Sequence, residues 1–302
     1  MKVLELNQVC KSYENVHAVK NLTLSIEKGS VFGLLGPNGA GKTSAIRMIM
    51  GIIHPDSGSI LRFGQSSIRD QTDRIGYLPE ERGLYPKMKV MDTILFFAEI
   101  KNQNRQQSEK SADSWLKRLE LEEWKDKKVE SLSRGMQQKL QFICTIIHNP
   151  ELIILDEPFT GLDPVNTSLI KDVILDLQRG GTTIIFSTHL MEQVEKLCKE
   201  ICLIDKGEAV LKGKLSEIKR QSGKNRIKLS YDGEARFLND PKLVKNYDNF
   251  GQYVEIDPAQ GIRPQQILAK AIEQVEITLF EIADPSLNEI FITSVKKTRS
   301  VQ

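Results

Sequence analysis

The segment GPNGAGKT, at residues 36–43, has the composition and spacing of a loop that binds phosphate. It matches the pattern G-x-x-x-x-G-K-[ST], and it lies between the apolar run SVFGLLG and the helical stretch TSAIRMIMGII, the context that the pattern requires. The glycines allow backbone angles that turn successive amides toward phosphate oxygens. A glycine-rich turn that binds nothing is the alternative, but the flanking strand and helix favour a phosphate loop.

Two side chains of this segment suit a nucleoside triphosphate. Lys42 would neutralise the β- and γ-phosphates, and the Thr43 hydroxyl would bind Mg²⁺. We therefore expect a nucleotide to contact Gly36, Pro37, Asn38, Gly39, Ala40, Gly41, Lys42, Thr43 and Ser44.

A second apolar run, ELIILDEP at residues 151–158, ends in two adjacent acids. Neighbours within a strand point to opposite faces, but at the end of a strand both can reach one site. We expect Asp156 to hold Mg²⁺ through water and Glu157 to act as general base on the water that attacks the γ-phosphate. Because acid pairs at strand ends are common, this pattern alone is a weak signal.

His189 ends a third apolar run, TTIIFSTH. In parallel sheets, ligands bind at the carboxyl ends of the strands. A lone histidine is more often structural, but this one lies on a predicted neighbour of the strand that carries Asp156, which favours a contact with the γ-phosphate.

Residues 132–138, LSRGMQQ, begin a predicted helix. Serines precede it, and apolar residues then recur at helical spacing. Ser133 and Gly135 leave the first turn open, and free amides at a helix N-terminus attract an anion. The segment therefore predicts a second anion site, although the residues alone do not identify the anion.

Composition places the chain among soluble globular proteins, with 40% apolar and 27% charged residues. The net charge of +2 gives no global attraction for nucleic acid, so we expect no nucleic-acid partner. No apolar run approaches the roughly 18 residues of a spanning helix, so we expect that this chain itself neither enters nor crosses a membrane. Its four cysteines include no CxxC pair, which suits a reducing cytoplasm.

An α/β core should position the residues named above. Residues 3–35 alternate like antiparallel strands, and at their end the run SVFGLLG is apolar throughout, as in a strand covered on both faces. Residues 84–130 carry mixed charge and no strand pattern, which predicts a helical insertion whose subdomain extends to about residue 145. An α/β pattern returns at residue 151, and the first domain, residues 1–215, ends with it.

The remaining residues, 216–302, are predicted to form a small α+β domain. Residues 212–228 are rich in lysine and arginine, which is typical of a solvated linker; contact with anionic lipid headgroups is the less favoured alternative. Beyond them, IKLSY and YVEI alternate like strands, and RPQQILAKAI is amphipathic. DPSLNEIFITSV predicts a helix that is capped by Asp284 or Ser286.

Five motifs, GPNGAGKT, LSRGMQQ, LIILDEP, GLDP and STHL, occur in an order that resembles the ATP-binding subunits of ABC transporters over residues 1–215. The resemblance implies a P-loop NTPase core of ABC ATPase type, with an antiparallel β subdomain and with ATP and Mg²⁺ as cofactors. It also implies that LSRGMQQ is the family signature, in which Ser133 and Gly135 contact the γ-phosphate of ATP held by a second subunit. Many members have glycine and glutamine in place of Arg134 and Met136, but the serine and the second glycine are retained here.

Three further residues are assigned by the same resemblance. Tyr13 looks like the aromatic residue that stacks on adenine, with packing within a strand as its alternative. Asp163, in GLDP, looks like the residue that links the two sites of a dimer, although Asp-Pro is also an ordinary helix start. Glu80 stands where the family usually has a glutamine that touches Mg²⁺ and reports on the membrane subunit; a carboxylate can bind Mg²⁺ as well, but it adds negative charge beside Asp156.

The resemblance implies an ATPase that pairs with a second ATP-binding subunit, expected to be a copy of this chain, and that drives an integral membrane permease from the cytoplasmic face of the cell membrane. The tail, ITLFEIADPSLNEIFITSV, resembles an accessory domain of some sodium and antibiotic exporters, which favours export. A DNA-repair ATPase of this superfamily would need a long heptad insertion, a translation-factor ATPase usually carries two cassettes, and a GTPase would carry an NKxD-like motif. The sequence has none of these features.

Overall fold

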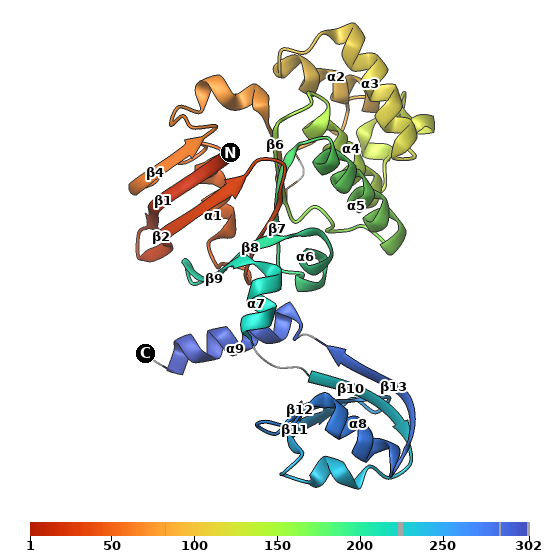
Figure 1. Ribbon diagram of the computed structural model, residues 1–302. Coiled ribbons are helices and arrows are strands. Elements are labelled where there is room, and N and C mark those ends of the chain that lie inside the picture. The colour runs from red at the N-terminus through yellow and green to blue at the C-terminus, as the bar shows by residue number, and fades with distance from the viewer. Residues whose placement is uncertain (82, 223–225, 284, 301–302) are drawn as a thin grey trace. The chain divides into compact units, whose positions relative to one another are not determined.

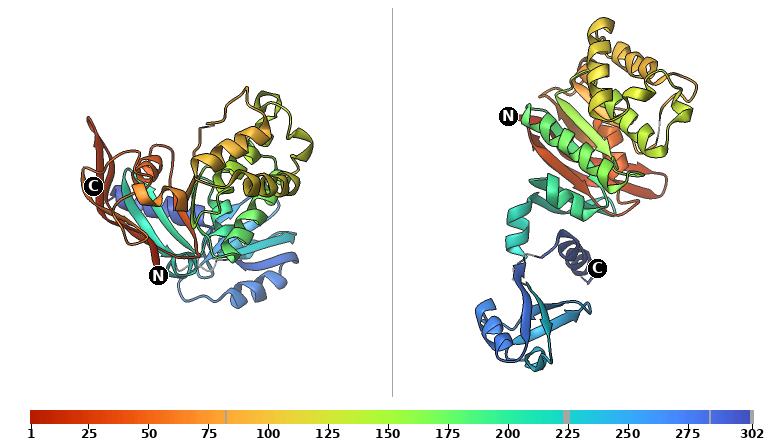
Figure 2. Two further views of the ribbon diagram at one scale, coloured as in Figure 1. Left: turned by 90° about the horizontal axis from the view of Figure 1, so that it is seen from above. Right: turned by 90° about the vertical axis from the view of Figure 1, so that its right-hand side faces the viewer.

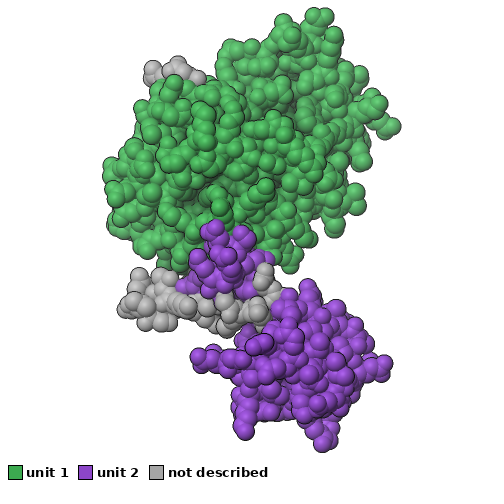
Figure 3. Space-filling view, in the orientation of Figure 1, with its two compact units in different colours: residues 1–215 green, residues 216–302 purple. Residues whose placement is uncertain are grey.

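The computed structural model describes residues 1–81, 83–222, 226–283 and 285–300. Its contacts divide the chain into two compact units, Met1–Leu215 and Ser216–Gln302, which Figure 3 colours separately. Across the part of the chain that is described, no helix is both long enough and apolar enough to span a membrane.

A six-stranded sheet forms the centre of the first unit (Figure 1). Its strands, in spatial order, are β5 (Ile75–Leu78), β6 (Leu152–Asp156), β7 (Thr183–Thr188), β3 (Val31–Leu35), β8 (Glu200–Asp205) and β9 (Glu208–Lys214). All neighbours are parallel except β8 and β9, which form an antiparallel hairpin. Every residue of β3, β6 and β7 is buried, as their unbroken apolar sequence predicts for strands covered on both faces.

A second, antiparallel sheet confirms the predicted β subdomain. It has the order β2–β1–β4, with β1 at Lys2–Tyr13, β2 at Val16–Glu27 and β4 at Ser57–Arg62. Helix α1 (Lys42–Ile49) packs with both sheets, because its apolar face belongs to one core cluster with side chains from β1, β2, β3 and β6. A short 3₁₀ helix, η1 (Arg69–Arg74), leads into β5.

The predicted helical insertion is also present. It contains α2 (Val90–Ile100), α3 (Arg105–Arg118), the 3₁₀ turns η2 (Glu122–Trp124) and η3 (Val129–Ser131), and α4 (Arg134–Ile146). Figures 1 and 2 show these helices gathered beside the two sheets. Two further helices, α5 (Pro164–Arg179) and α6 (Met191–Leu197), connect the later strands of the central sheet.

The second unit has an antiparallel sheet of order β11–β12–β10–β13. Its elements are α7 (Leu215–Gln221), β10 (Arg226–Asp232), η4 (Arg236–Asn239), β11 (Val244–Asn249), β12 (Val254–Pro258), α8 (Pro264–Ile272), β13 (Glu276–Ala283) and α9 (Leu287–Ser300). The apolar face of α8 packs on the sheet, since Ile267 and Ala271 are buried in one cluster with Ile227 and Leu229. This is the predicted α+β arrangement.

The C-terminal unit differs from the sequence prediction in its linker. The prediction of a linker at residues 212–228 is wrong for most of that range, because β9 continues to Lys214 and α7 follows it. Leu215 and Ile218 are apolar and buried despite the basic residues around them. Of the two predicted caps, Asp284 lies outside the described residues. Ser286 is the observed cap: its hydroxyl accepts from the Glu289 amide at 3.3 Å, and the Glu289 carboxylate accepts from the Ser286 amide at 2.9 Å.

Candidate functional site

The glycine-rich loop lies between the end of β3 and the start of α1. Gly36 and Gly41 have φ angles of 150° and 109°, which side chains rarely adopt. A Cβ atom would lie 2.2 Å from the Ile204 carbonyl oxygen at Gly36 and 2.2 Å from the Ala18 carbonyl oxygen at Gly41. Both positions therefore require glycine, because the backbone of neighbouring strands approaches the loop closely.

Lys42 is buried inside this loop. Its ammonium donates to the Gly36 carbonyl at 2.8 Å and to the Pro37 carbonyl at 3.1 Å. Burial lowers the pKa of Lys42, and the carboxylates of Glu157, Asp156 and Glu80 oppose this shift. The loop thus holds a cation whose charge is supported by three nearby acids.

A pocket of about 550 Å³ opens beside the loop. Five parts of the first unit form its wall: the turn between β1 and β2 with the start of β2, the glycine-rich loop, the segment after β5, the end of β6, and the turn between β8 and β9. The lining residues are Asn15, Val16, His17, Ala18, Lys20, Asn38, Gly39, Ala40, Gly41, Lys42, Thr43, Ser44, Glu80, Asp156, Glu157 and Lys206.

Asp156 lies at the end of β6 with 1% of its surface exposed. Burial raises the pKa of Asp156, and the carboxylates of Glu80 and Glu157 raise it further, whereas the Ser187 hydroxyl and the Lys42 ammonium lower it. Two or three carboxylates in one partly buried site create a demand for positive charge.

A divalent cation with oxygen ligands fits this demand. The Thr43 hydroxyl donates to Asp156 Oδ2 at 3.4 Å, so these two oxygens already lie side by side, and Glu80 lines the same pocket. Mg²⁺ prefers oxygen ligands and usually takes only one or two carboxylates from the protein, together with water and phosphate. The described residues contain no group of three His, Cys, Asp or Glu side chains arranged to hold a metal.

Glu157 leaves the strand with a φ of 48°, an unusual angle for a residue other than glycine. This backbone turn directs its buried carboxylate to the end of β7. There Oε2 accepts from the Thr188 hydroxyl at 3.0 Å, and Oε1 accepts from the His189 amide at 3.0 Å and from His189 Nδ1 at 2.7 Å. Because a carboxylate only accepts, Nδ1 carries the hydrogen in this contact. The carboxylate is therefore fixed by three donors, of which sequence reasoning anticipated none.

His189 and Tyr13 are accessible, but neither lines the pocket. The His189 ring contacts Glu157, and 47% of its side chain is exposed. Tyr13 ends β1, is 42% exposed, and has the Lys11 ammonium 5.7 Å from its ring centroid. The γ-phosphate contact of His189 and the adenine stack of Tyr13 both stay predictions.

Ser133, Gly135 and Asp163 lie at two helix N-termini, outside the lining of this pocket. Ser133 is the N-cap of α4, where its hydroxyl accepts from the Met136 amide at 3.3 Å. Asp163 is the N-cap of α5, and hydrogen bonds from Asn166 lower the pKa of its carboxylate. A Cβ at Gly135 would lie 3.6 Å from the Gly161 carbonyl oxygen, so the two helix N-termini are neighbours. None of the three predicted residues lines the 550 Å³ pocket of its own chain.

Sequence reasoning missed several residues of the pocket wall. Asn15, Val16, His17 and Ala18 lie within five residues of Tyr13, so their nearness in sequence to a predicted site residue was the available signal. Lys20 and Lys206 gave no such signal, because only the folded chain brings them beside the loop.

Comparison with protein families and with curated relatives agrees with the motifs. The family model for ABC transporters matches residues 19–160, and the model for the C-terminal domain of DrrA1-3-like ATP-binding proteins matches residues 213–295. The uncharacterized ABC transporter ATP-binding protein YhaQ of Bacillus subtilis is 43% identical and covers 97% of this chain and 98% of the relative. The linearmycin resistance ATP-binding protein LnrL of Bacillus subtilis is 34% identical, and the match covers 98% of this chain and 99% of the relative. The Nod factor export ATP-binding protein I of Burkholderia thailandensis is 37% identical over 70% of each chain.

Solved structures show the same similarity for part of the chain. A structure described as the ATP-binding subunit of an ABC transporter matches with a TM-score of 0.68 and 28% identity, and covers 73% of this chain and 93% of that chain. The structure of cbiO1 from Clostridium perfringens, part of the cbiONQ transporter complex, matches with a TM-score of 0.64 and 28% identity, with 73% and 94% covered.

Proposed function

Because the chain belongs to the ATP-binding proteins of ABC transporters, which are ATPases, we propose that it hydrolyses ATP in the pocket beside the phosphate loop and so drives a separate membrane permease. One observation carries the location of this centre. Lys42, Thr43, Asp156 and Glu157 come from two distant segments of the sequence and line one pocket. These four side chains supply the cation, the two metal ligands and the base that phosphoryl transfer to water requires.

ATP binding uses the loop first. The backbone amides of residues 38–41 and the Lys42 ammonium bind phosphate oxygens, and the ammonium exchanges its two carbonyl contacts for stronger contacts with charged oxygens. Thr43, Asp156 and Glu80 would hold Mg²⁺, which supplies electrostatic stabilisation of the developing phosphate charge.

Hydrolysis uses the fixed carboxylate of Glu157. A water molecule attacks the γ-phosphorus, its proton moves to Glu157, and the bond from the γ-phosphorus to the bridging oxygen of ADP breaks. Thr188 and His189 hold the carboxylate in position, so the base loses little orientational freedom at the transition state. His189 is exposed at the end of β7 and contributes a contact to the γ-phosphate.

The signature of one subunit acts on ATP that a second copy of the chain holds. The support is that Ser133, Gly135 and Asp163 lie at two neighbouring helix N-termini outside the chain's own pocket. Free amides at the start of the 13-residue helix α4 favour a bound anion. ATP bridges the two subunits, whereas ADP lacks the γ-phosphate that reaches the signature, so ATP favours the closed dimer and hydrolysis opens it.

The permease binds the helical side of the first unit, and transport is export. Proteins of this family typically pair with a membrane permease. A mainly apolar pocket of about 260 Å³ lies among α2, α4 and the segment after β5, and half-exposed Ile100 and Tyr85 supply apolar surface in this region. The names of the antibiotic-resistance and Nod factor export relatives support the direction. The subunit would thus be held at the cytoplasmic face of the cell membrane by its permease.

The substitution Glu157→Gln tests this function. With Mg²⁺ and ATP, we expect phosphate release to fall by at least about 100-fold, because a general base contributes factors of this size. ATP binding should persist, since Glu157 does not hold ATP, and the variant should elute as a dimer in size-exclusion chromatography. Glu123→Gln removes an exposed charge of the helical insertion and is the matched control. Wild-type turnover by Glu157→Gln would refute the assigned role.

A further inference from the structure

The turn between β8 and β9 contains an unusual choice of residue. Only Lys206 and Gly207 connect the two strands, and both have positive φ angles, 48° and 84°. Such two-residue hairpin turns favour Asn-Gly, Asp-Gly or Gly-Gly, because both residues need a positive φ, which the Cβ atom disfavours in most other residues. A strained residue of this kind persists where something else requires it, and it often marks a functional site.

Several contacts fix this turn beside the phosphate loop. The Gly207 amide donates to the Ala40 carbonyl at 2.9 Å, and the Lys20 amide donates to the Gly207 carbonyl at 2.8 Å. A Cβ at Gly207 would lie 3.0 Å from the carbonyl oxygens of His17 and Ala18. The turn is therefore held between the loop and β2, and Lys206 lines the 550 Å³ pocket.

The lysines that line this pocket differ in the contacts that their ammonium groups make. Lys42 donates to two loop carbonyls, and the Lys20 ammonium lies 3.2 Å from the Glu208 carboxylate. Among the residues that the structure describes, the Lys206 side chain has no hydrogen bond or ion pair, and it is exposed. An unpaired cation beside a phosphate-binding loop is suited to an anionic ligand.

The sheet order indicates which part of a nucleotide this lysine reaches. Strands run in the order β5–β6–β7–β3–β8–β9, so the acids at the ends of β5 and β6 lie on one side of β3 and the Lys206 turn lies on the other. Glu80, Asp156 and Glu157 define the γ-phosphate side. Lys206 therefore faces the end of the site that the α-phosphate and ribose occupy.

We propose that Lys206 is a further nucleotide-binding residue, whose ammonium contacts the diphosphate portion that ATP and ADP share. The inference rests on the proposed function, because it needs the nucleotide to lie in this pocket. It assigns to the β8–β9 turn a role in affinity for both nucleotides and no role in the chemical step.

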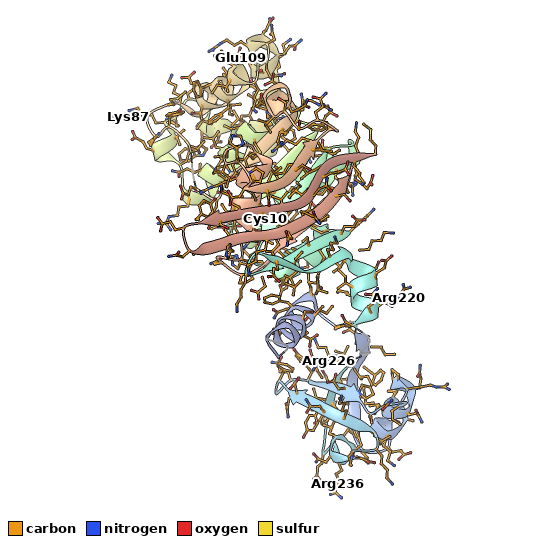
Figure 4. All side chains as sticks on the ribbon, turned by 90° about the vertical axis from the view of Figure 1, so that its left-hand side faces the viewer. Cys10, Lys87, Glu109, Arg220, Arg226 and Arg236 are labelled. Atoms are coloured by element: carbon orange, nitrogen blue, oxygen red, sulfur yellow. The ribbon has the colours of Figure 1, made fainter. Side chains whose placement is uncertain are left out.

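The test compares Lys206→Asn with Lys206→Arg and with Lys87→Asn. Asparagine suits the positive φ of the turn and removes the charge, arginine keeps the charge, and Lys87 is an exposed lysine of the helical side (Figure 4), so it controls for net charge. Dissociation constants for ATP and for ADP would be measured by calorimetry with Mg²⁺ at low ionic strength, where exposed charges are least screened. Thermal unfolding without nucleotide would be measured in parallel.

We expect Lys206→Asn to weaken ATP and ADP by a similar factor, about three- to tenfold. Its melting temperature should equal or exceed that of the wild type, because the turn loses its strain, whereas Lys206→Arg and Lys87→Asn should bind as the wild type does. Wild-type affinity of Lys206→Asn for both nucleotides, or a loss for ATP alone, would overturn this inference and leave the proposed function intact. A wild-type protein that binds neither nucleotide would overturn the proposed function and this inference with it.

Discussion

At the residue scale, His148 is a buried titratable group outside the proposed catalytic centre. His148 follows α4 in the sequence, and 5% of its surface is exposed. Its Nε2 donates to the Ile75 carbonyl oxygen at 3.3 Å. Nδ1 has no partner among the described residues. Burial lowers the pKa of His148 to about 4, and the nearby Lys101 ammonium contributes. An unfolded histidine titrates near 6.5, so below that pH the unfolded chain binds a proton that the folded chain excludes.

We expect this histidine to make the first unit less stable in acid. The free energy of unfolding falls as the pH decreases from 6.5 toward 4, because the unfolded chain gains a proton on His148. At pH 5 the loss of unfolding free energy is on the order of 1–2 kcal/mol. In His148→Gln, the amide can still donate to the Ile75 carbonyl but does not titrate, so the difference in unfolding free energy between pH 7 and pH 5 should shrink. Urea unfolding followed by tryptophan fluorescence measures this, because Trp115 and Trp124 are the two tryptophans and both lie in the first unit. The exposed His54→Gln is the control, and an unchanged pH dependence in His148→Gln would contradict the assignment.

The residues predicted from sequence differ from the missed ones in how local their signals are. Lys42, Thr43, Asp156 and Glu157 are specified by short patterns at the end of an apolar strand, and the structure places all four around one pocket. Lys206 lies on a hairpin turn that reaches the loop only because β8 is paired with β3. No pattern within the turn itself records that pairing.

At the element scale, one arginine connects four elements of the C-terminal unit. Arg226 begins β10 (Figure 4), and its guanidinium lies 3.3 Å from Asp248 of β11, 3.0 Å from Glu255 and 2.9 Å from Asp257 of β12, and 2.6 Å from Glu289 of α9. Partial burial lowers the pKa of Arg226, but Asp257, Glu289 and Glu255 together outweigh this effect and raise it above its usual value. One cation is thus shared by four carboxylates from the sheet and from the last helix.

Removing this cation should loosen α9 from the sheet. In Arg226→Met, four carboxylates lose the guanidinium that they share, and we expect a loss of about 2–4 kcal/mol in the stability of this unit at pH 7. Hydrogen exchange of the α9 amides, residues 287–300, would measure it. Arg236→Met breaks only the exposed pair with Glu234 and should cost less than about 1 kcal/mol; equal effects of the two substitutions would refute the role of Arg226.

The C-terminal elements also show where sequence patterns fail. Strand β11, VKNYDN, was not predicted, because it has one buried apolar residue and several polar ones, and its pairing with β12 defines it instead. Helix α7 was assigned to a linker because basic residues hide its two buried apolar positions. In both cases tertiary contacts override a weak local preference.

At the scale of the whole molecule, the central question is whether two copies of the chain form each ATPase site. On the proposed function, each site takes its phosphate loop and base from one copy and its signature from the other. A substitution in the loop and one in the signature then affect residues that different copies supply to a site. A substitution in the loop and one in the base affect residues that the same copy supplies. A symmetric dimer makes this distinction measurable.

We expect a mixture of Lys42→Ala and Ser133→Arg proteins to recover ATPase activity that neither has alone. In a mixed dimer, the loop of the Ser133→Arg copy meets the intact signature of the Lys42→Ala copy and forms one complete site. With random exchange at equal concentrations, half of the dimers are mixed, so about a quarter of the wild-type activity should return. Tryptophan fluorescence would first establish that Ser133→Arg is folded, because loss of this N-cap costs about 1 kcal/mol.

The control mixture is Lys42→Ala with Glu157→Gln, which should stay inactive because every mixed dimer then has a defect in each site. Recovery in the first mixture and none in the second would support a site shared between two copies. If the first mixture is no more active than its separate components, ATP is not held between a loop and a signature of identical chains, and a different second subunit is required.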